Sequence, residues 1–398
     1  MKKSSSYLFL LLIFLLPTQL GSYFFFPFSY INGIRIDYLA PALYLTDGVV
    51  FLLFITSYRK ILPLSRLFGI FIVLITLVSF IFAIESSWIA LYKAVKILEM
   101  ILLFQIARQI KIKPKNILAV FIASLLLQLS LAILQLSNQG SLQHIFYFLG
   151  ERYFTIGTPG IAKISIDGHE ILRPYATFSH PNSMGGFAVL LYSFVLWKKE
   201  FRQYPLLKTA LLIITSLLTI ISFSKGAIMT YILITIAHAW VYTRRSCGFC
   251  FISKLFFIGI LSMLFLNFHG DPESFEKRVR LTMNSFEIIL KHPFFGVGIG
   301  NYLYAQSIFP TPYSYSFLQP VHNIFLLAIA ELGIPLFIAL LSFLVKKLRY
   351  YRHHSLFLIC ILVVVITGSL DHYWYTLQQN MLILAVISGL ALQKDMVQ

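Results

Sequence analysis

Charged residues are scarce in this chain. Only 12% of its 398 residues are Asp, Glu, Lys or Arg and 58% are hydrophobic, whereas a soluble domain carries about 25% charged residues. Long apolar runs recur from one end of the sequence to the other without a polar block, and a soluble core cannot hold them all. The composition therefore predicts an all-α, polytopic membrane protein in which residues 1–398 form a single integral membrane domain.

Cysteine and metal-binding patterns are also scarce. Three cysteines cannot build a disulfide framework, and Cys247 and Cys250 form a lone CxxC pair without the further ligands that zinc needs. The sequence has no Asp-x-Asp pair to hold Mg²⁺ on a diphosphate. It also has no repeat and no low-complexity tract. We therefore expect no metal and no cofactor.

A transmembrane helix needs roughly 20 mostly apolar residues, and the sequence accommodates about twelve. The first follows Lys2 and Lys3 and has no small-residue cleavage site after it, so we interpret it as an uncleaved transmembrane helix and not a signal peptide. The predicted helices cover residues 7–24, 39–57, 67–84, 87–107, 116–136, 183–197, 206–222, 226–243, 251–268, 322–345, 355–370 and 377–393.

Basic residues outnumber acidic ones, with 32 Lys and Arg against 15 Asp and Glu. If the N-terminus lies in the cytoplasm, 21 of the 32 fall on cytoplasmic segments, as the positive-inside rule requires. The excess charge is therefore a topology signal and gives no reason to expect nucleic-acid binding. We predict a multi-pass protein of the cytoplasmic (inner) membrane with both termini in the cytoplasm.

Two connections are long, residues 137–182 and 269–321, and both fall on the outer face in this topology. Long loops in compact proteins usually carry function, so we expect these extracytoplasmic loops to form the active site. The second loop contains a short amphipathic helix suited to the membrane surface. Its apolar stripe consists of Val279, Met283, Phe286 and Leu290. Its polar side consists of Lys277, Arg280, Glu287 and Lys291.

The first polar cluster spans Arg173 to Asn182 and leads into a helix. His180 and Asn182 suit either helix capping or a functional role. An Arg at the end of a loop, such as Arg173, either reaches lipid headgroups or holds an anionic ligand. The same two interpretations apply to Lys225, which lies in the turn Ser222–Ala227 on the outer side, against the positive-inside bias.

The second polar cluster begins with Arg278 and Arg280 and runs through glycines 296, 298 and 300 to Asn301. The glycine spacing resembles a dinucleotide-binding motif, but such a motif follows a strand and this one follows a helix. Farther on, His322 and Asn323 open a predicted transmembrane helix that contains Glu331. An ionisable group there is either functional or paired with a base such as Lys93 or Lys96.

The order of these features resembles the O-antigen ligase and polymerase superfamily. Its members share Arg-x-x-x-Thr-Phe-x-His-Pro-Asn, a Ser-Arg-Gly-Ala turn, an Arg-led surface helix ending in His-Pro-x-x-Gly-x-Gly-x-Gly-Asn, and His-Asn before Glu-Leu-Gly. The four segments here, between Arg173 and Gly333, match these motifs, except that Lys225 stands where the family usually has Arg.

The resemblance implies that His322 is the catalytic base and that Arg278, Arg173 and Lys225 bind a diphosphate, although Arg280 could take the place of Arg278. Guanidinium groups grip a diphosphate in pairs, and a neutral His can take a proton from a hydroxyl. Supporting roles are expected for the polar residues around these four. They are His180, Asn182, Arg280, Asn301, Asn323 and Glu331.

The expected activity is glycosyl transfer without a metal. An undecaprenyl-diphosphate-linked glycan would be the donor, and a glycan, lipid or protein hydroxyl would be the acceptor. A polymerase that joins repeat units on the carrier would use the same motifs. A flippase or transporter is disfavoured because transporters are usually built from paired halves. The segment Asp371–Trp374 opens the last outer turn and has no motif-based role.

Overall fold

The computed structural model describes residues 3–58, 66–166, 168–243, 259, 272–310 and 318–393. Cys247 and Cys250 lie outside these residues, and so does the predicted transmembrane helix 251–268 apart from Gly259. The described chain is mostly helical, which confirms the predicted all-α class in its coarse form. Three short two-stranded antiparallel sheets accompany the helices.

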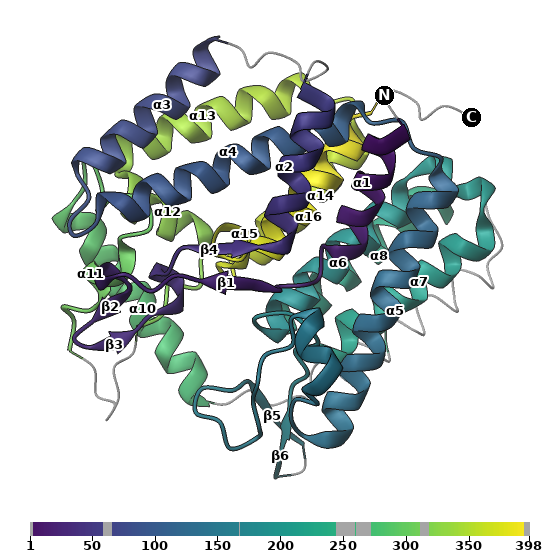
Figure 1. Cartoon of the computed structure of the whole chain (residues 1–398), viewed down its shortest axis with the longest axis horizontal. Coiled ribbons are helices and arrows are strands. Elements are labelled where there is room, and N and C mark those ends of the chain that lie inside the picture. Colours follow the sequence, from purple (N-terminus) through teal and green to yellow (C-terminus); the bar gives the residue numbers. More distant parts are fainter. Residues whose placement is uncertain are drawn as a thin grey trace.

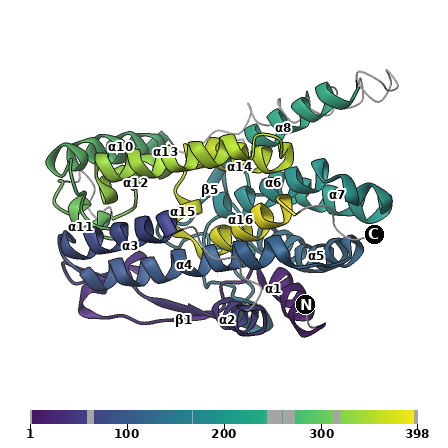
Figure 2. The same cartoon turned by 90° about the horizontal axis from the view of Figure 1, so that it is seen from above.

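Ten helices make up the main bundle among the described residues. Figure 1 shows them along the chain, and Figure 2 shows α14 and a further helix, α13 (Ile334–Tyr350), on one side of α4 and α16, with α1 and α2 on the other. They are α1 (Lys3–Leu15), α2 (Leu45–Ser57), α3 (Arg66–Ile81), α4 (Ser87–Gln109), α5 (Pro114–Asn138), α6 (Pro181–Trp197), α7 (Pro205–Ile221), α8 (Lys225–Thr243), α14 (Ser355–Gly368) and α16 (Gln378–Ala391).

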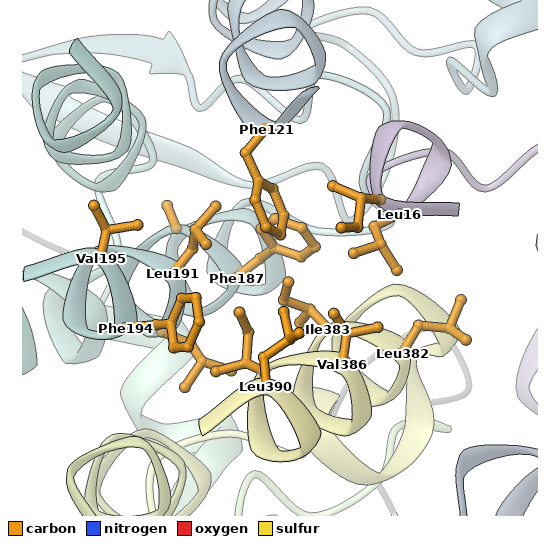
Figure 3. Packing of buried hydrophobic residues seen from close by; sticks show 14 of the residues in the cluster. Leu16, Phe121, Phe187, Leu191, Phe194, Val195, Leu382, Ile383, Val386 and Leu390 are labelled. Atoms are coloured by element: carbon orange, nitrogen blue, oxygen red, sulfur yellow. The ribbon is translucent and has the colours of Figure 1, made fainter. Parts of the chain in front are cut away.

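Helix α6 lies at the centre of the bundle. Every residue from Pro181 to Val195 is buried, and α7, α8, α14 and α16 all contact it. Figure 3 shows Phe187, Leu191 and Phe194 of α6 packed against α16 and Phe121 of α5. A helix that is apolar on all sides is stable only when neighbours surround it. The central position of α6 fixes the first polar cluster, which directly precedes it.

Most predicted helix bounds agree with the structure to within a few residues, but three need correction. The predicted helix 322–345 is broken into α12 (Ile324–Leu332) and α13 (Ile334–Tyr350). Gly333 interrupts it, because its φ of +76° cannot continue a helix. The predicted helices 7–24 and 39–57 start or end differently, since α1 stops at Leu15 and α2 begins at Leu45.

The connection between α1 and α2 is a third long loop, which corrects the expectation of only two. Pro17 follows the end of α1, and proline cannot continue a helix. The loop, residues 16–44, holds two antiparallel strand pairs, β1 (Gly21–Tyr23) with β4 (Ala42–Tyr44) and, between them in the chain, the hairpin of β2 (Tyr30–Ile31) and β3 (Ile34–Arg35). Asn32 and Gly33 turn between β2 and β3 with positive φ, as Asn-Gly turns do. We call residues 16–44 the N-terminal strap.

The two predicted loops are partly regular as well. Residues 139–180 hold a 3-10 helix (His144–Leu149) and the hairpin β5 (Lys163–Ile166) and β6 (His169–Leu172). The other contains α10 (Pro272–Lys291) and α11 (Tyr302–Gln306). The expected apolar stripe of α10 is exposed, with Met283 62% and Leu290 78% accessible. A second apolar side, including Leu281 and Ile288, packs inward.

The molecule has two distinct ends. Figure 1 shows the start of α1 and the end of α16 at one end and β5 and β6 at the opposite end. At the terminal end, the Gln393 amide donates to the carbonyls of Ala107 and Ile110, and Lys198 Nζ donates to the Leu390 carbonyl. Several segments rich in basic residues therefore meet at this end. The opposite end, which we call the loop end, holds the polar clusters.

One helix among the described residues, Pro114–Asn138, is long and apolar enough to cross a membrane by length and composition. Seven shorter apolar helices have 10 to 17 residues. The count of about twelve transmembrane helices is therefore not confirmed and stays a prediction. The short α12, ended by Gly333, is one reason why apolar sequence runs overstate helix length.

Candidate active site

Three ionisable side chains meet at the loop end. His322 precedes α12, whereas Asp371 and His372 lie between α14 and α15 (Tyr373–Thr376). One nitrogen or oxygen atom of each lies within 4.8 Å of those of the other two. The His322 and His372 rings meet edge to face, with centroids 5.2 Å apart. We call these three residues the central cluster.

Asp371 is the anion of the central cluster. It is buried, and it accepts hydrogen bonds of 2.7 Å from Asn182 Nδ2 and from the His372 backbone N–H. Burial alone would raise its pKa. Attraction to Arg278 and to the protonated forms of His322 and His372, which exist only at low pH, together outweighs burial and holds the pKa well below its usual range. Asp371 is therefore a fixed negative charge beside His322.

His322 is neutral at physiological pH in this arrangement. Burial lowers its pKa to about 3; Asp371 opposes this shift, while His372 and Arg278 add to it. Its Nδ1 atom is enclosed and has no hydrogen-bond partner among the described residues. Most buried polar atoms in proteins have a partner. An unpartnered, neutral imidazole nitrogen can accept a proton, which suits a base.

Arg278 reaches the central cluster from α10. Its guanidinium Nη1 donates a 3.1 Å hydrogen bond to the carbonyl of Leu370, the residue before Asp371. Arg280 instead lies 3.5 Å from Glu276 on its own helix. Of the two arginines that the sequence left as alternatives, Arg278 is the one beside Asp371.

Arg173 ties two of the polar segments together. Its Nε and Nη2 donate to the Ser222 carbonyl at 3.1 and 2.9 Å, and Nη2 also donates to Asn182 Oδ1 at 2.6 Å. Burial lowers its pKa to about 10, so the guanidinium stays charged at neutral pH. Much of its donor capacity is thus used within the protein, which makes it a positioning residue as well as a charge.

Lys225 begins α8 at the same turn. A Cβ placed on the next residue, Gly226, would lie 3.1 Å from Leu370 Cδ1. The α7–α8 turn therefore packs against the residue that precedes Asp371. Lys225 itself is exposed at the start of the helix.

His180 caps the start of α6, and Asn182 connects Arg173 to Asp371. His180 precedes α6, and its Nδ1 accepts a 3.1 Å hydrogen bond from the Asn182 backbone N–H. Burial, with Arg173 second, lowers its pKa well below the usual value, so it is a neutral acceptor. Asn182 bridges Arg173 and Asp371 through its two side-chain polar atoms. The capping interpretation is thus correct for His180, and Asn182 belongs to the network around Asp371.

The other supporting residues hold the scaffold. Asn323 Oδ1 accepts from the Phe325 and Leu326 N–H groups and caps α12, and its Nδ2 donates to the Ser369 carbonyl. Asn301 bonds the backbone of Ser86 at the start of α4. Both asparagines therefore fix the ends of helices near the site.

Glu331 accepts a 2.6 Å hydrogen bond from the Tyr375 hydroxyl. Lys93 lies close enough to attract it, whereas Lys96 pairs with Asp47 and Glu99. Of the two partners predicted for Glu331, the nearby one is thus Lys93.

The glycine-rich segment serves packing. Gly296 and Gly333 both have positive φ, and a Cβ on either would lie 2.4 Å from a backbone atom of the opposite segment. Val297 N and Gly298 N donate to the carbonyls of Ala330 and Glu331. The segment therefore docks α10 onto the α12–α13 break. It follows a helix, α10, and not the strand that a dinucleotide site would require.

Sequence reasoning gave no role to Asp371 and His372, yet they are central to the structure. Apart from tyrosines and one cysteine, they are the only ionisable side chains between residues 355 and 393. An Asp-His pair in an otherwise apolar stretch is a functional signal. The two His and one Asp are also donor types that a divalent metal can use, although His372 Nδ1 lies 2.7 Å from Thr376 Oγ1.

Residues 210–341 match the family model described as O-antigen ligase. In this segment the chain is similar to the O-antigen ligase family. The match covers three of the four motif segments, including Lys225, Arg278 and His322, and confirms the resemblance drawn from them. It supports membrane association, a lipid-linked glycan substrate and a role in polysaccharide biosynthesis. No curated protein matches the chain.

Proposed function

We propose that this O-antigen ligase-type protein is a glycosyltransferase at the outer face of the cytoplasmic membrane. The donor is a glycan on an undecaprenyl-diphosphate-type carrier, and the acceptor is a hydroxyl group. One observation carries this proposal: His322, Asp371 and Arg278 come from three separate segments and meet at the loop end. A base, an anion and a cation in contact are the groups that this reaction needs.

The reaction is a displacement at the first sugar carbon. The neutral His322 imidazole takes the proton of the acceptor hydroxyl as the oxygen bonds to that carbon. The bond from the same carbon to the carrier diphosphate breaks, and the diphosphate leaves with the electron pair. Asp371 stabilises the imidazolium that forms, as a carboxylate beside a catalytic histidine does.

The cations near the central cluster stabilise the negative charge of the leaving diphosphate. Arg278 lies nearest the central cluster, and Lys225 and Arg173 flank the same α7–α8 turn. Arg278 uses one guanidinium nitrogen, Nη1, to donate to the Leu370 carbonyl, so the other guanidinium nitrogens can donate to a diphosphate. Lys225 supplies a point charge without bidentate geometry. These cations do the work that Mg²⁺ does in other transferases, so the proposal needs no metal.

The test is reconstitution of the purified protein in vesicles with a lipid-linked oligosaccharide and an acceptor, with products sized on a gel. His322→Ala is expected to lower the transfer rate by about 10²–10⁴-fold, the usual contribution of a general base. Arg278→Ala is expected to lower the transfer rate by a comparable factor, because the negative charge on the leaving diphosphate loses its cationic partner. Full activity in both variants, correctly inserted, contradicts the mechanism.

The same assay separates the competing functions. Transfer to a second molecule indicates a ligase, and a ladder on the carrier indicates a polymerase. Carrier scrambling without transfer indicates a flippase and contradicts the proposal. Activity that persists in EDTA supports the metal-free mechanism, and activity that EDTA removes and a divalent metal restores would assign the central cluster to metal binding.

A further inference from the structure

Helix α13 has little cover from the rest of the protein. None of its residues is fully buried, and the apolar side chains of Ile338, Leu341 and Leu344 are between 43% and 55% exposed. In a membrane protein, apolar side chains exposed along a helix face the acyl chains of lipids. The uncovered side of α13 is therefore a surface for acyl chains.

The last turn of α13 and the turn that leads to α14 are strongly basic. No Asp or Glu occurs between residues 332 and 370, and the exposed cations here have no acidic partner among the described residues. Four of them fall within seven residues. They are Lys346, Lys347, Arg349 and Arg352.

A second basic turn, between α4 and α5, meets this one. The guanidinium carbon of Arg108, in the last turn of α4, lies 5.9 Å from the centroid of the Tyr351 ring. Lys111, Lys113 and Lys115 follow within seven residues and are exposed, and no Asp or Glu occurs between residues 100 and 150. The two turns together place eight cations, four from each, side by side at the terminal end.

The connection between α6 and α7 at the same end shows the contrast. Lys198 pairs with Glu200 at 3.0 Å and also donates to the Leu390 carbonyl, and Lys208 donates to the Leu196 carbonyl. Cations that are paired inside the protein have little charge to offer a ligand. The eight cations of the other two turns have no such acid beside them in the sequence, so their charge faces outward.

We infer that the α4–α5 and α13–α14 turns bind the headgroup of an anionic phospholipid, whose acyl chains lie along α13. Lys and Arg bind phosphate through charge-assisted hydrogen bonds, and clusters of four to eight of them directly beyond a membrane helix attract anionic headgroups. Tyr350, 74% exposed, and Tyr351 supply the amphipathic rings that favour the headgroup level. A soluble anion would use the cations and leave the apolar side of α13 uncovered.

Cardiolipin is the expected best ligand, because its two phosphates can contact one turn each. The inference does not depend on the proposed transfer reaction, and its test needs no catalysis. Native mass spectrometry of the purified full chain in detergent measures binding after cardiolipin, phosphatidylglycerol or phosphatidylcholine is added. Wild type is expected to bind cardiolipin at least about tenfold more tightly than phosphatidylcholine, since only the former is anionic.

The double variant Arg349→Gln with Arg352→Gln removes two cations from the α13–α14 turn. We expect it to bind cardiolipin about tenfold more weakly or worse, because each cation near an anionic surface contributes about fivefold. The matched control is Lys199→Gln with Arg202→Gln, which removes two exposed cations from the α6–α7 connection. This control is expected to bind cardiolipin as wild type does.

A second double variant, Lys111→Gln with Lys113→Gln, tests the other turn. It should weaken cardiolipin binding by a similar factor, and unchanged binding would overturn the two-turn site. Equal weakening in the α6–α7 control would show a general attraction of charge and would also overturn it. Competition of inorganic diphosphate with cardiolipin at equal concentration would assign the cations to a soluble anion, and equal binding of cardiolipin and phosphatidylcholine would leave no anionic-lipid site.

Discussion

At the scale of single residues, the site is built on bridges between distant segments. Asn182 joins Arg173 to Asp371, and Arg173 in turn holds the α7–α8 turn through the Ser222 carbonyl. The motifs predicted roles for His322, Arg278 and the residues around Asn182 from the sequence alone. They could not identify Asp371, because its importance comes from contacts with residues 189 positions away.

Arg173→Lys tests the bridge. Lysine cannot reproduce the three hydrogen bonds of the guanidinium, each charged bond being worth ~1.5–3 kcal/mol. We expect a lower thermal unfolding temperature in detergent and a transfer rate reduced by about tenfold or more. The control is Arg202→Lys, an exposed arginine at the terminal end of the molecule. Equal stability and rate in the two variants would show that the bridge is dispensable.

The pH dependence of transfer tests His322 as the base. Its pKa in the free protein is about 3, below its usual value of about 6.5. The imidazole thus stays neutral as the pH falls from about 8 to about 5, and kcat/KM should not decline over that range because of His322. A bound diphosphate adds negative charge, which raises the pKa, so the acid limb of kcat should lie at higher pH than that of kcat/KM.

Arg278→Gln extends this test. Arg278 lowers the pKa of His322, so its removal should move the acid limb of kcat/KM to higher pH in the residual activity. A wild-type acid limb near pH 6.5, unmoved by Arg278→Gln, would exclude His322 as the titrating base.

At the scale of elements, helices were predictable and their interruptions were not. Long apolar runs such as residues 116–136 gave bounds close to those of α5. The break at Gly333 depends on its docking against the glycine-rich segment, a tertiary contact that periodicity does not contain. The N-terminal strap carried its own signals, Pro17, Pro27 and Asn32-Gly33, but its aromatic residues resembled the start and end of apolar helices.

Gly333→Ala tests the break between α12 and α13. An alanine there has an unfavourable positive φ, costing ~1–3 kcal/mol, and its Cβ would lie 2.4 Å from the Phe294 carbonyl oxygen. We expect the unfolding temperature in detergent to fall by at least about 2 °C. Gly48→Ala is the matched control, since nothing lies within 4 Å of its Cβ position in α2. An equal response of both variants would contradict the docking role.

At the scale of the whole molecule, the separation of the two ends agrees with the charge pattern. Basic segments meet at the terminal end, and the polar clusters meet at the loop end. The sequence predicted this grouping because insertion retains positive loops in the cytoplasm. The sequence could not predict the cavity of about 730 Å³ that is lined by the N-terminal strap, the loop 143–153 and helices α4 and α16, because these segments lie far apart in the chain.

Cysteine labelling of intact spheroplasts tests the orientation. In a full chain with Cys247 and Cys250 replaced by serine, Tyr153→Cys should react with a membrane-impermeant maleimide from outside. Arg202→Cys should react only after permeabilisation, because it lies at the terminal end. Cys360 is buried and should give little background. The reverse pattern would invert the topology and move the site to the cytosol.

The amphipathic helix α10 connects the position of Arg278 in the site to whatever covers the exposed stripe of the helix. One side of this helix packs on the protein, its opposite stripe is exposed, and Arg278 projects from it to the Leu370 carbonyl. If headgroups cover the exposed stripe, their packing sets the depth of the helix and thereby the position of the guanidinium. Stiff or crowded membranes would then support glycan transfer at a different rate from fluid ones, with no change in the amount of enzyme.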